Sequence, residues 1–172
     1  MAEDRPPVEL RVGTAFDAHR LVAGRPLVLG GVAIAHPYGL DGHSDADLVC
    51  HALLDASLGA TGQGDIGRRF PSTPAWRDAR SLDLLTTAWS ELADGGWRLV
   101  NADCVLVGQE PRIAPYVAAM AARLAAGMRS TPDRVSVRGT TTDGLGFVGR
   151  GEGLAAQAVV LVERRPTARG DD

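Results

Sequence analysis

One carboxylate and two imidazoles in the first third of the chain are residue types that hold a divalent transition metal. Asp17 and His19 are two residues apart, and His51 closes the later segment Ser-Asp-Ala-Asp-Leu-Val-Cys-His. Zinc accepts carboxylate and imidazole ligands, and three protein ligands leave the fourth coordination position open for a substrate. The alternative is a loop hydrogen bond between Asp17 and His19 and a solvent-facing His51. The metal interpretation predicts an enzyme.

Three other segments carry side chains suited to phosphate groups or to a second cation. Residues 39–45 include His43 and lead toward a predicted helix N-terminus, where free backbone amides attract phosphate. Residues 64–71 combine glycines, a carboxylate and two arginines, and residues 140–143 place three threonines before an aspartate that could hold magnesium. The alternatives are an ordinary polar loop, solvated arginines and the simple β propensity of threonine.

The composition limits the class of protein. A chain of 172 residues with 45% hydrophobic residues is long enough for one domain with its own core. Its net charge of -3 does not favour nucleic acid as a partner, and no apolar run approaches the roughly 20 residues that span a bilayer. All 18 basic residues are arginines, so any side-chain cation that contacts phosphate must be an arginine.

The cysteines and the first residues indicate the cellular compartment. Cys50 and Cys104 lie in apolar runs, which favours two buried, reduced thiols over a disulfide. Residues 1–9 are polar and contain prolines, unlike a secretory signal. We therefore expect a cytoplasmic protein.

The hydrophobic pattern predicts an α+β fold in a single domain over residues 10–163, with flexible tails at 1–9 and 164–172. We expect a mixed four-stranded sheet covered on one side by helices, plus a small N-terminal β-hairpin. The run at 154–162 is apolar on both faces, which places it inside the sheet. Strands are predicted at 10–16, 26–34 (with a tight bend at Gly30-Gly31), 97–107, 134–138 and 154–162, and helices at 44–58, 81–93 and 113–126.

The helix at 44–58 would present His51 to the site. Ser44 is a good N-cap residue, and Asp47, His51 and Asp55 fall at four-residue steps along one polar stripe. This spacing directs His51 away from the main core. Asp55 could orient its imidazole, although a solvated helical charge is the alternative.

Seven ordered motifs together resemble one enzyme family. They are Gly13-x-x-Phe16-Asp17-x-His19, Gly30-Gly31-Val32, His43-Ser44-Asp45-x-Asp47, His51-Ala52-Leu53-x-Asp55-Ala56, Gly64-Asp65-Ile66-Gly67-x-x-Phe70-Pro71, Thr140-Thr141-Thr142 and Leu145-Gly146-Phe147-x-Gly149-Arg150-Gly151-Glu152-Gly153. Between Arg11 and Val162 the chain resembles the 2-C-methyl-D-erythritol 2,4-cyclodiphosphate synthases of the non-mevalonate isoprenoid pathway.

The resemblance implies an activity and an assembly. Members convert 4-diphosphocytidyl-2-C-methyl-D-erythritol 2-phosphate to the cyclic diphosphate and release CMP, as homotrimers with active sites between adjacent subunits. By this resemblance Asp17, His19 and His51 bind one transition-metal ion of the zinc type. Magnesium or manganese accompanies the substrate diphosphate near Asp143, where the family has a glutamate. Some relatives are fused to a cytidylyltransferase, and we expect the cyclase alone here.

The resemblance also assigns site residues. His43 and Thr141 match positions that stabilise the transition state, and Arg150 and Glu152 match positions lining a central channel that implies an isoprenoid diphosphate as its ligand. The substrate-binding residues on this basis are Ser44, Asp65, Gly67, Gly108, Gln109, Glu110, Pro111, Arg112, Ile113, Ala114, Thr140, Thr142, Phe147 and Arg150. Among them, residues 108–114 match the cytidine-diphosphate pocket of the family, where Arg112 could approach a phosphate.

Two functions from other classes remain open at this point. A metal-dependent phosphohydrolase would use Asp17, His19 and His51 to activate a water molecule and would form linear monophosphates. A non-catalytic trimer would bind isoprenoid diphosphates through Arg150 and would have no need of the metal ligands.

Overall fold

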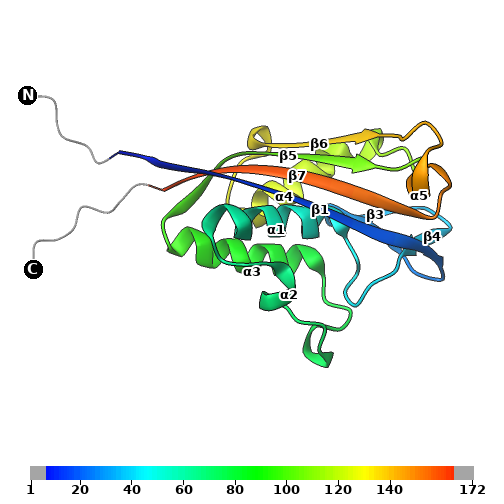
Figure 1. Ribbon diagram of the computed structural model, residues 1–172, viewed down its shortest axis with the longest axis horizontal. Coiled ribbons are helices and arrows are strands. Elements are labelled where there is room, and N and C mark those ends of the chain that lie inside the picture. The colour runs from blue at the N-terminus through cyan, green and yellow to red at the C-terminus, as the bar shows by residue number, and fades with distance from the viewer. Residues whose placement is uncertain (1–6, 165–172) are drawn as a thin grey trace, which may run out of the picture.

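A five-stranded mixed sheet, in the order β4-β1-β7-β5-β6, forms the frame of the protein (Figure 1). The computed structural model describes residues 7–164. Strands β5 and β6 are parallel, and the other neighbours are antiparallel. The central strand is β7, as its two apolar faces predict. The strands are β1 (Glu9–Ala23), β4 (Tyr38–Leu40), β5 (Trp97–Val107), β6 (Val135–Thr140) and β7 (Gly153–Arg164).

The prediction of four strands in this sheet is wrong, because β1 continues well past Phe16. Its residues alternate between a side facing the helices and an exposed side, so the polar Asp17 and His19 do not interrupt the strand. The extension pairs with a strand that the sequence did not reveal, β4, through Leu21 and Leu40.

A separate two-stranded sheet contains β2 (Leu27–Leu29) and β3 (Val32–Ile34), which pair antiparallel. The bend between them is at Gly30 and Gly31, with φ angles of 56° and 73°. Glycine adopts these angles without the steric cost that a Cβ atom would bring. The backbone amides of this turn donate hydrogen bonds to the carboxylate of Asp47 over 2.9 and 2.6 Å.

The helices lie largely where the hydrophobic pattern predicts them. Helix α3 starts at Ser81 as expected, whereas α4 starts later than predicted because residues 114–116, which include Pro115, form a 3-10 turn. The helices are α1 (Leu48–Thr61), α2 (Ile66–Arg69), α3 (Ser81–Asp94), α4 (Val117–Gly127) and α5 (Gly146–Gly149), with 3-10 turns η1 (Pro74–Trp76), η2 (Ala114–Tyr116) and η3 (Pro132–Arg134). Within residues 7–164, no helix is long and apolar enough to cross a membrane.

The N-cap of α1 is Asp47 and not Ser44. Its Oδ1 atom accepts hydrogen bonds from the backbone amides of Val49 and Cys50, both over 3.2 Å. Asp47 is fully buried, so the predicted polar stripe does not exist at this position. The reason is tertiary: the same carboxylate also binds the β2–β3 turn, which sequence periodicity cannot show.

Helices α1, α3 and α4 cover one face of the sheet and enclose the core (Figure 1). Trp89 of α3 is buried there, and its Nε1 atom donates to Ser57 Oγ of α1 over 3.0 Å. Cys50 and Cys104 are buried and free, as expected.

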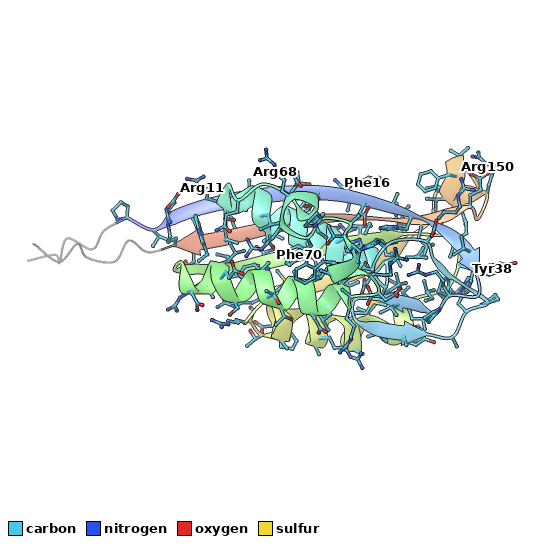
Figure 2. The ribbon with its side chains drawn as sticks, turned by 90° about the horizontal axis from the view of Figure 1, so that it is seen from below. Arg11, Phe16, Tyr38, Arg68, Phe70 and Arg150 are labelled. Carbon is cyan, nitrogen blue, oxygen red and sulfur yellow. The ribbon has the colours of Figure 1, made fainter. Side chains whose placement is uncertain are left out.

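The opposite face of the sheet is open in the described chain and carries an apolar patch on β1 and β7. Val12 and Phe16 of β1 are 68% and 63% exposed, and Val159 of the adjacent β7 is 42% exposed. Figure 2 shows Phe16 on the side of β1 turned away from α3. An apolar surface of this kind is typical of protein interfaces.

The predicted tail boundaries need correction at two residues. Glu9 and Arg164 pair with each other in the sheet, and Arg164 Nη2 lies 2.8 Å from Glu9 Oε2. Residues 1–6 and 165–172 of the predicted tails lie outside the described residues.

Candidate active site

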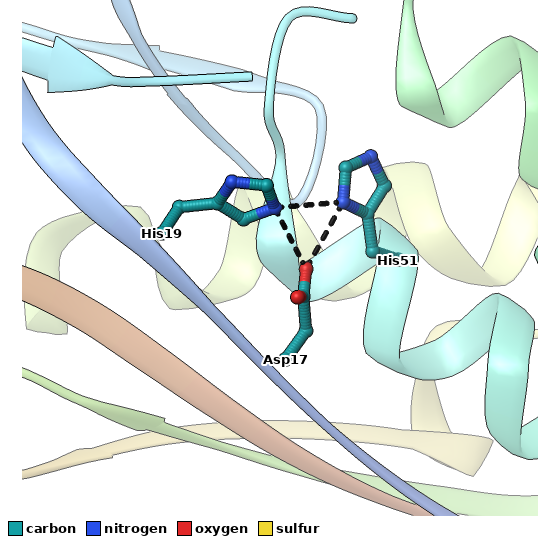
Figure 3. Close-up of side chains that lie close together, drawn as sticks. All are labelled: Asp17, His19 and His51. Atoms are coloured by element: carbon teal, nitrogen blue, oxygen red, sulfur yellow. Dashed lines mark hydrogen bonds and ion pairs between the residues drawn. The ribbon is translucent and has the colours of Figure 1, made fainter. Parts of the chain in front are cut away.

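Asp17, His19 and His51 converge on one point between β1 and α1 (Figure 3). Asp17 Oδ2 lies 3.0 Å from both His19 Nε2 and His51 Nδ1, and the two imidazole nitrogens are 3.2 Å apart. Asp17 and His19 share the helix-facing side of β1 because they are two residues apart. His51 comes from the first turns of α1, which packs against β1.

Hydrogen bonds on the far side of each imidazole determine which nitrogen faces the centre. His19 Nδ1 lies 2.6 Å from the carbonyl oxygen of Asp41, which only accepts, so the ring proton sits on Nδ1. His51 Nε2 lies 2.9 Å from the hydroxyl of Ser81 and 3.2 Å from that of Ser44. With neutral rings in these tautomers, two imidazole lone pairs and a carboxylate oxygen face one another and require a cation or a proton between them.

The protonation of the centre follows the same electrostatics. Burial opposes ionisation of Asp17, but hydrogen bonds and charge from His19 and His51 outweigh burial and hold its pKa below the usual range. Burial also opposes charging of His19, yet the hydrogen bond and charge of Asp17 outweigh it and raise the His19 pKa above its ordinary value of 6.5. The centre therefore favours positive charge.

A cavity of about 260 Å³ opens beside these three side chains, and several other predicted residues line it. His43, Ser44 and Gly67 line it with Asp17, His19 and His51. His43 Nε2 lies 2.7 Å from the carbonyl oxygen of Thr73. Asp65 caps the adjacent helix α2, where its Oδ1 accepts from the Arg68 amide over 2.8 Å.

The spacing of Asp55 suggested that it would orient His51, but in the structure Asp55 binds elsewhere. Its Oδ1 atom accepts a hydrogen bond from the Ile66 amide over 2.6 Å and so ties α1 to α2. Ser81 instead contacts the imidazole, and sequence analysis missed it. No local pattern marks Ser81, because it comes from α3 and meets His51 only through packing.

A second cavity of about 730 Å³ lies beside the ends of β5 and β6 and is lined by most of the predicted nucleotide-binding residues, so we call it the nucleotide-type cavity. Gln109 Nε2, in a side chain lining it, is buried and has no hydrogen-bond partner among the described residues. Buried donors without a partner are rare in folded proteins, so this amide is an unsatisfied group in the wall of the cavity. The predicted residues in its lining are Gly108, Gln109, Pro111, Arg112, Ile113, Ala114, Thr140 and Thr141.

The loop after β6 holds the candidate second-cation ligand. Thr141 Oγ1 donates to Asp143 Oδ1 over 3.3 Å, and Thr142 Oγ1 donates to the Leu145 carbonyl over 2.6 Å. Both Asp143 and Thr141 are exposed. Thr140 and Thr141 belong to the larger cavity, so this carboxylate lies two residues from that lining.

The remaining predicted residues gather around the turn between α5 and β7. Phe147 and Glu152 line a cavity of about 240 Å³ that His19 also borders. Glu110 and Arg150 share a neighbouring cavity of about 410 Å³, and Arg150 Nε lies 2.7 Å from Glu152 Oε1. The cavity at Asp17, His19 and His51 and the nucleotide-type cavity share no lining residue within one chain.

Known proteins resemble this chain in sequence over nearly its whole length. The YgbB family model matches residues 10–163. A protein named 2-C-methyl-D-erythritol 2,4-cyclodiphosphate synthase from Symbiobacterium thermophilum is 55% identical over 155 residues, which are 90% of this chain and 99% of that relative. The protein of the same name from Geobacillus kaustophilus is 53% identical over 155 residues, which are 90% and 98% of the two chains.

Solved structures show the same fold. A 2C-methyl-D-erythritol-2,4-cyclodiphosphate synthase in its CDP-bound form is 40% identical with a TM-score of 0.80, covering 88% of this chain and 99% of that one. The bifunctional IspDF of Campylobacter jejuni is 38% identical with a TM-score of 0.88 over 93% of this chain, which spans only 44% of that longer protein. This chain therefore belongs to the YgbB family of 2-C-methyl-D-erythritol 2,4-cyclodiphosphate synthases.

Proposed function

We propose that this protein converts 4-diphosphocytidyl-2-C-methyl-D-erythritol 2-phosphate to 2-C-methyl-D-erythritol 2,4-cyclodiphosphate and releases CMP. The observation that carries the proposal is the convergence of Asp17, His19 and His51 beside a cavity that also holds His43 and Ser44. Membership of the synthase family supports the choice of substrate.

The residues of the centre fit a zinc-type ion. They offer one carboxylate oxygen and two imidazole nitrogens within 4.8 Å of one another, a ligand set that zinc accepts with one position left for another ligand. When bound, such an ion would supply positive charge beside the diphosphate and make its phosphorus a better electrophile.

The reaction needs no nucleophile from the protein, because the 2-phosphate of the substrate attacks its own β-phosphorus while CMP leaves. The protein must fold a flexible anion so that its two ends meet, and such positioning can lower a barrier by about 7 to 11 kcal/mol in the best cases. His43 and Ser44 line one side of the cavity, beside Asp17, His19 and His51. The Thr141 hydroxyl would supply a hydrogen-bond donor at the leaving group.

The nucleotide half of the substrate fits the larger cavity. Its lining contains Arg112, whose guanidinium suits phosphate. One solved relative is described as the CDP-bound form, which supports this placement. Magnesium or manganese would accompany the diphosphate near Asp143, whose side chain is one methylene shorter than the glutamate of the family pattern.

A homotrimer would complete the site. The cavity at Asp17, His19 and His51 and the nucleotide-type cavity share no lining residue within one chain, which is consistent with a substrate held by the metal centre of one subunit and the nucleotide-type cavity of its neighbour. The open apolar face of the sheet, with Val12 and Phe16, is the surface suited to that contact. Phe147, Arg150 and Glu152 would then approach a central channel, with an isoprenoid diphosphate as the candidate ligand.

The test is to incubate the protein with the diphosphocytidyl substrate and magnesium and to weigh the products. The cyclic diphosphate together with CMP is the expected result, and the His51→Ala variant should produce neither. A linear product heavier by one water would make the protein a phosphohydrolase instead. Unchanged binding of isoprenoid diphosphates with no turnover would make it a non-catalytic trimer.

A further inference from the structure

Ser81 forms a hydrogen-bonded bridge between a carboxylate and the imidazole of His51. It is the first residue of α3 and is 1% exposed. Its Oγ atom lies 2.9 Å from His51 Nε2 and is hydrogen-bonded to Asp45 Oδ1. The backbone amide of Ser81 also donates to Asp45 Oδ1 over 3.1 Å, which holds the serine in place.

The direction of each hydrogen bond follows from the chemistry of the groups. A carboxylate only accepts, so the single proton of the Ser81 hydroxyl points to Asp45. Toward His51 the same oxygen can only accept, so the imidazole must donate from Nε2. A neutral ring with its proton on Nε2 has its lone pair on Nδ1, the atom that faces Asp17 over 3.0 Å.

Ser44 adds to the same arrangement. Its Oγ atom lies 3.1 Å from Ser81 Oγ and 3.2 Å from His51 Nε2, and it accepts from the Ala46 amide over 3.1 Å. The Ser44 proton is therefore available to Ser81, whose oxygen is a better acceptor because its own proton is donated to the Asp45 carboxylate.

We propose that Asp45 and Ser81 are positioning residues that fix the tautomer and the orientation of His51 for metal binding. The inference rests on the proposed metal function of the site and deepens it. The bridge performs the task that the sequence pattern suggested for Asp55, which is instead bound to the Ile66 amide. When the hydrogen-bond partner of a metal-bound histidine is removed, the metal affinity of the site typically falls by about 10- to 100-fold.

The experiment compares zinc affinity and the His51 tautomer in the unaltered protein and three serine variants, and measures zinc affinity also in His51→Ala. Zinc affinity is measured by competition with a chelator, and the tautomer of the metal-free protein by nitrogen NMR of the imidazole. Ser81→Ala should weaken zinc binding by about 10-fold or more and should populate the form with the proton on Nδ1. Ser81→Thr retains the hydroxyl and should restore both measurements toward those of the unaltered protein.

Ser57→Ala is the matched control, because Ser57 is also a buried serine and contacts Trp89 away from the metal ligands. It should lower the melting temperature without changing zinc affinity or the tautomer. If Ser81→Ala leaves both measurements unchanged while His51→Ala loses zinc, the bridge is refuted and the metal site stands. If His51→Ala binds zinc as tightly as the unaltered protein, the metal site itself is refuted together with the bridge.

Discussion

Asp17 Oδ2 and His51 Nδ1 lie 3.0 Å apart although 34 residues separate them in the sequence. Asp17 comes from the middle of a strand and His51 from the helix that crosses it, so the packing of α1 on β1 creates the contact. Two acceptor groups at this distance form a stable arrangement when a cation or a proton lies between them.

Asp17→Asn tests this relationship with little change of shape. The variant removes the negative charge of the centre and should weaken zinc binding by more than about 100-fold. This loss exceeds the effect of about 10- to 100-fold that is typical of residues that contact the ligands and not the metal itself. CMP release should fall in parallel. Titration with zinc against a chelator checks the affinity, and Asp83→Asn on the exposed side of α3 is the control. Equal zinc affinity in the Asp17→Asn variant and the unaltered protein would falsify the assignment.

The metal-free protein should lose stability as the pH rises above 6.5. Asp17 raises the pKa of His19, so the stabilisation from protonated His19 is complete below 6.5 and is lost as the pH passes the higher folded-state pKa. The lowered pKa of Asp17 keeps that carboxylate ionised over this range, and its own contribution is lost only as the pH falls below 3.8. Urea unfolding at several pH values measures the effect. The loss of unfolding free energy with rising pH should be smaller in Asp17→Asn than in the unaltered protein. An identical pH dependence in the two proteins would contradict the coupling between Asp17 and His19.

Asp47→Ala should destabilise the fold strongly. The fully buried carboxylate accepts from the amides of Gly30, Gly31, Val49 and Cys50, and its removal leaves these donors without partners. We expect the free energy of unfolding to fall by about 3 kcal/mol or more, because each buried unpaired group costs about 1 to 3 kcal/mol. Chemical denaturation measures it. Asp83→Ala, at an exposed ion pair of 3.8 Å, should cost less than about 1 kcal/mol.

Phe16→Glu should abolish the proposed homotrimer. Phe16 is 63% exposed in the single chain, and a buried, unpaired charge at the interface would oppose association. Ala122→Glu adds the same charge to an exposed position on α4, on the helix-covered side of the sheet, and should remain trimeric. Light scattering after size-exclusion chromatography gives the masses. A Phe16→Glu variant with the mass of three chains would place the interface elsewhere.

Asp143→Ala should increase the magnesium concentration needed for half-maximal CMP release by about tenfold, which corresponds to about 1.4 kcal/mol of binding free energy. Asp143→Glu should not increase it, because the longer carboxylate matches the family pattern. Zinc affinity, measured separately, should be unchanged in both variants. A magnesium requirement that is the same in all three proteins would remove Asp143 from the second-cation site.

Several elements could be predicted from the sequence because they depend on local patterns. Strand β5 lies at residues 97–107 as predicted, and β7 is the central strand, as its apolar sequence on both faces predicted. The length of β1 was missed, since polar residues at its second half resemble a loop. The cap of α1 was assigned to Ser44 because the partners of Asp47 lie in a distant turn.

By itself, the sequence determined the residue types of the site, the family motifs and most helices and strands, because these depend on composition and short-range spacing. Only the tertiary structure decided which groups meet. In the folded chain Asp17 and His19 lie beside His51. The hydroxyl of Ser81, and not Asp55, contacts the His51 imidazole. The cavity at these three residues shares no lining residue with the nucleotide-type cavity. The physical reason is that these contacts form between elements distant in the chain, where packing of α1 and α3 on the sheet, and not spacing, fixes the distances.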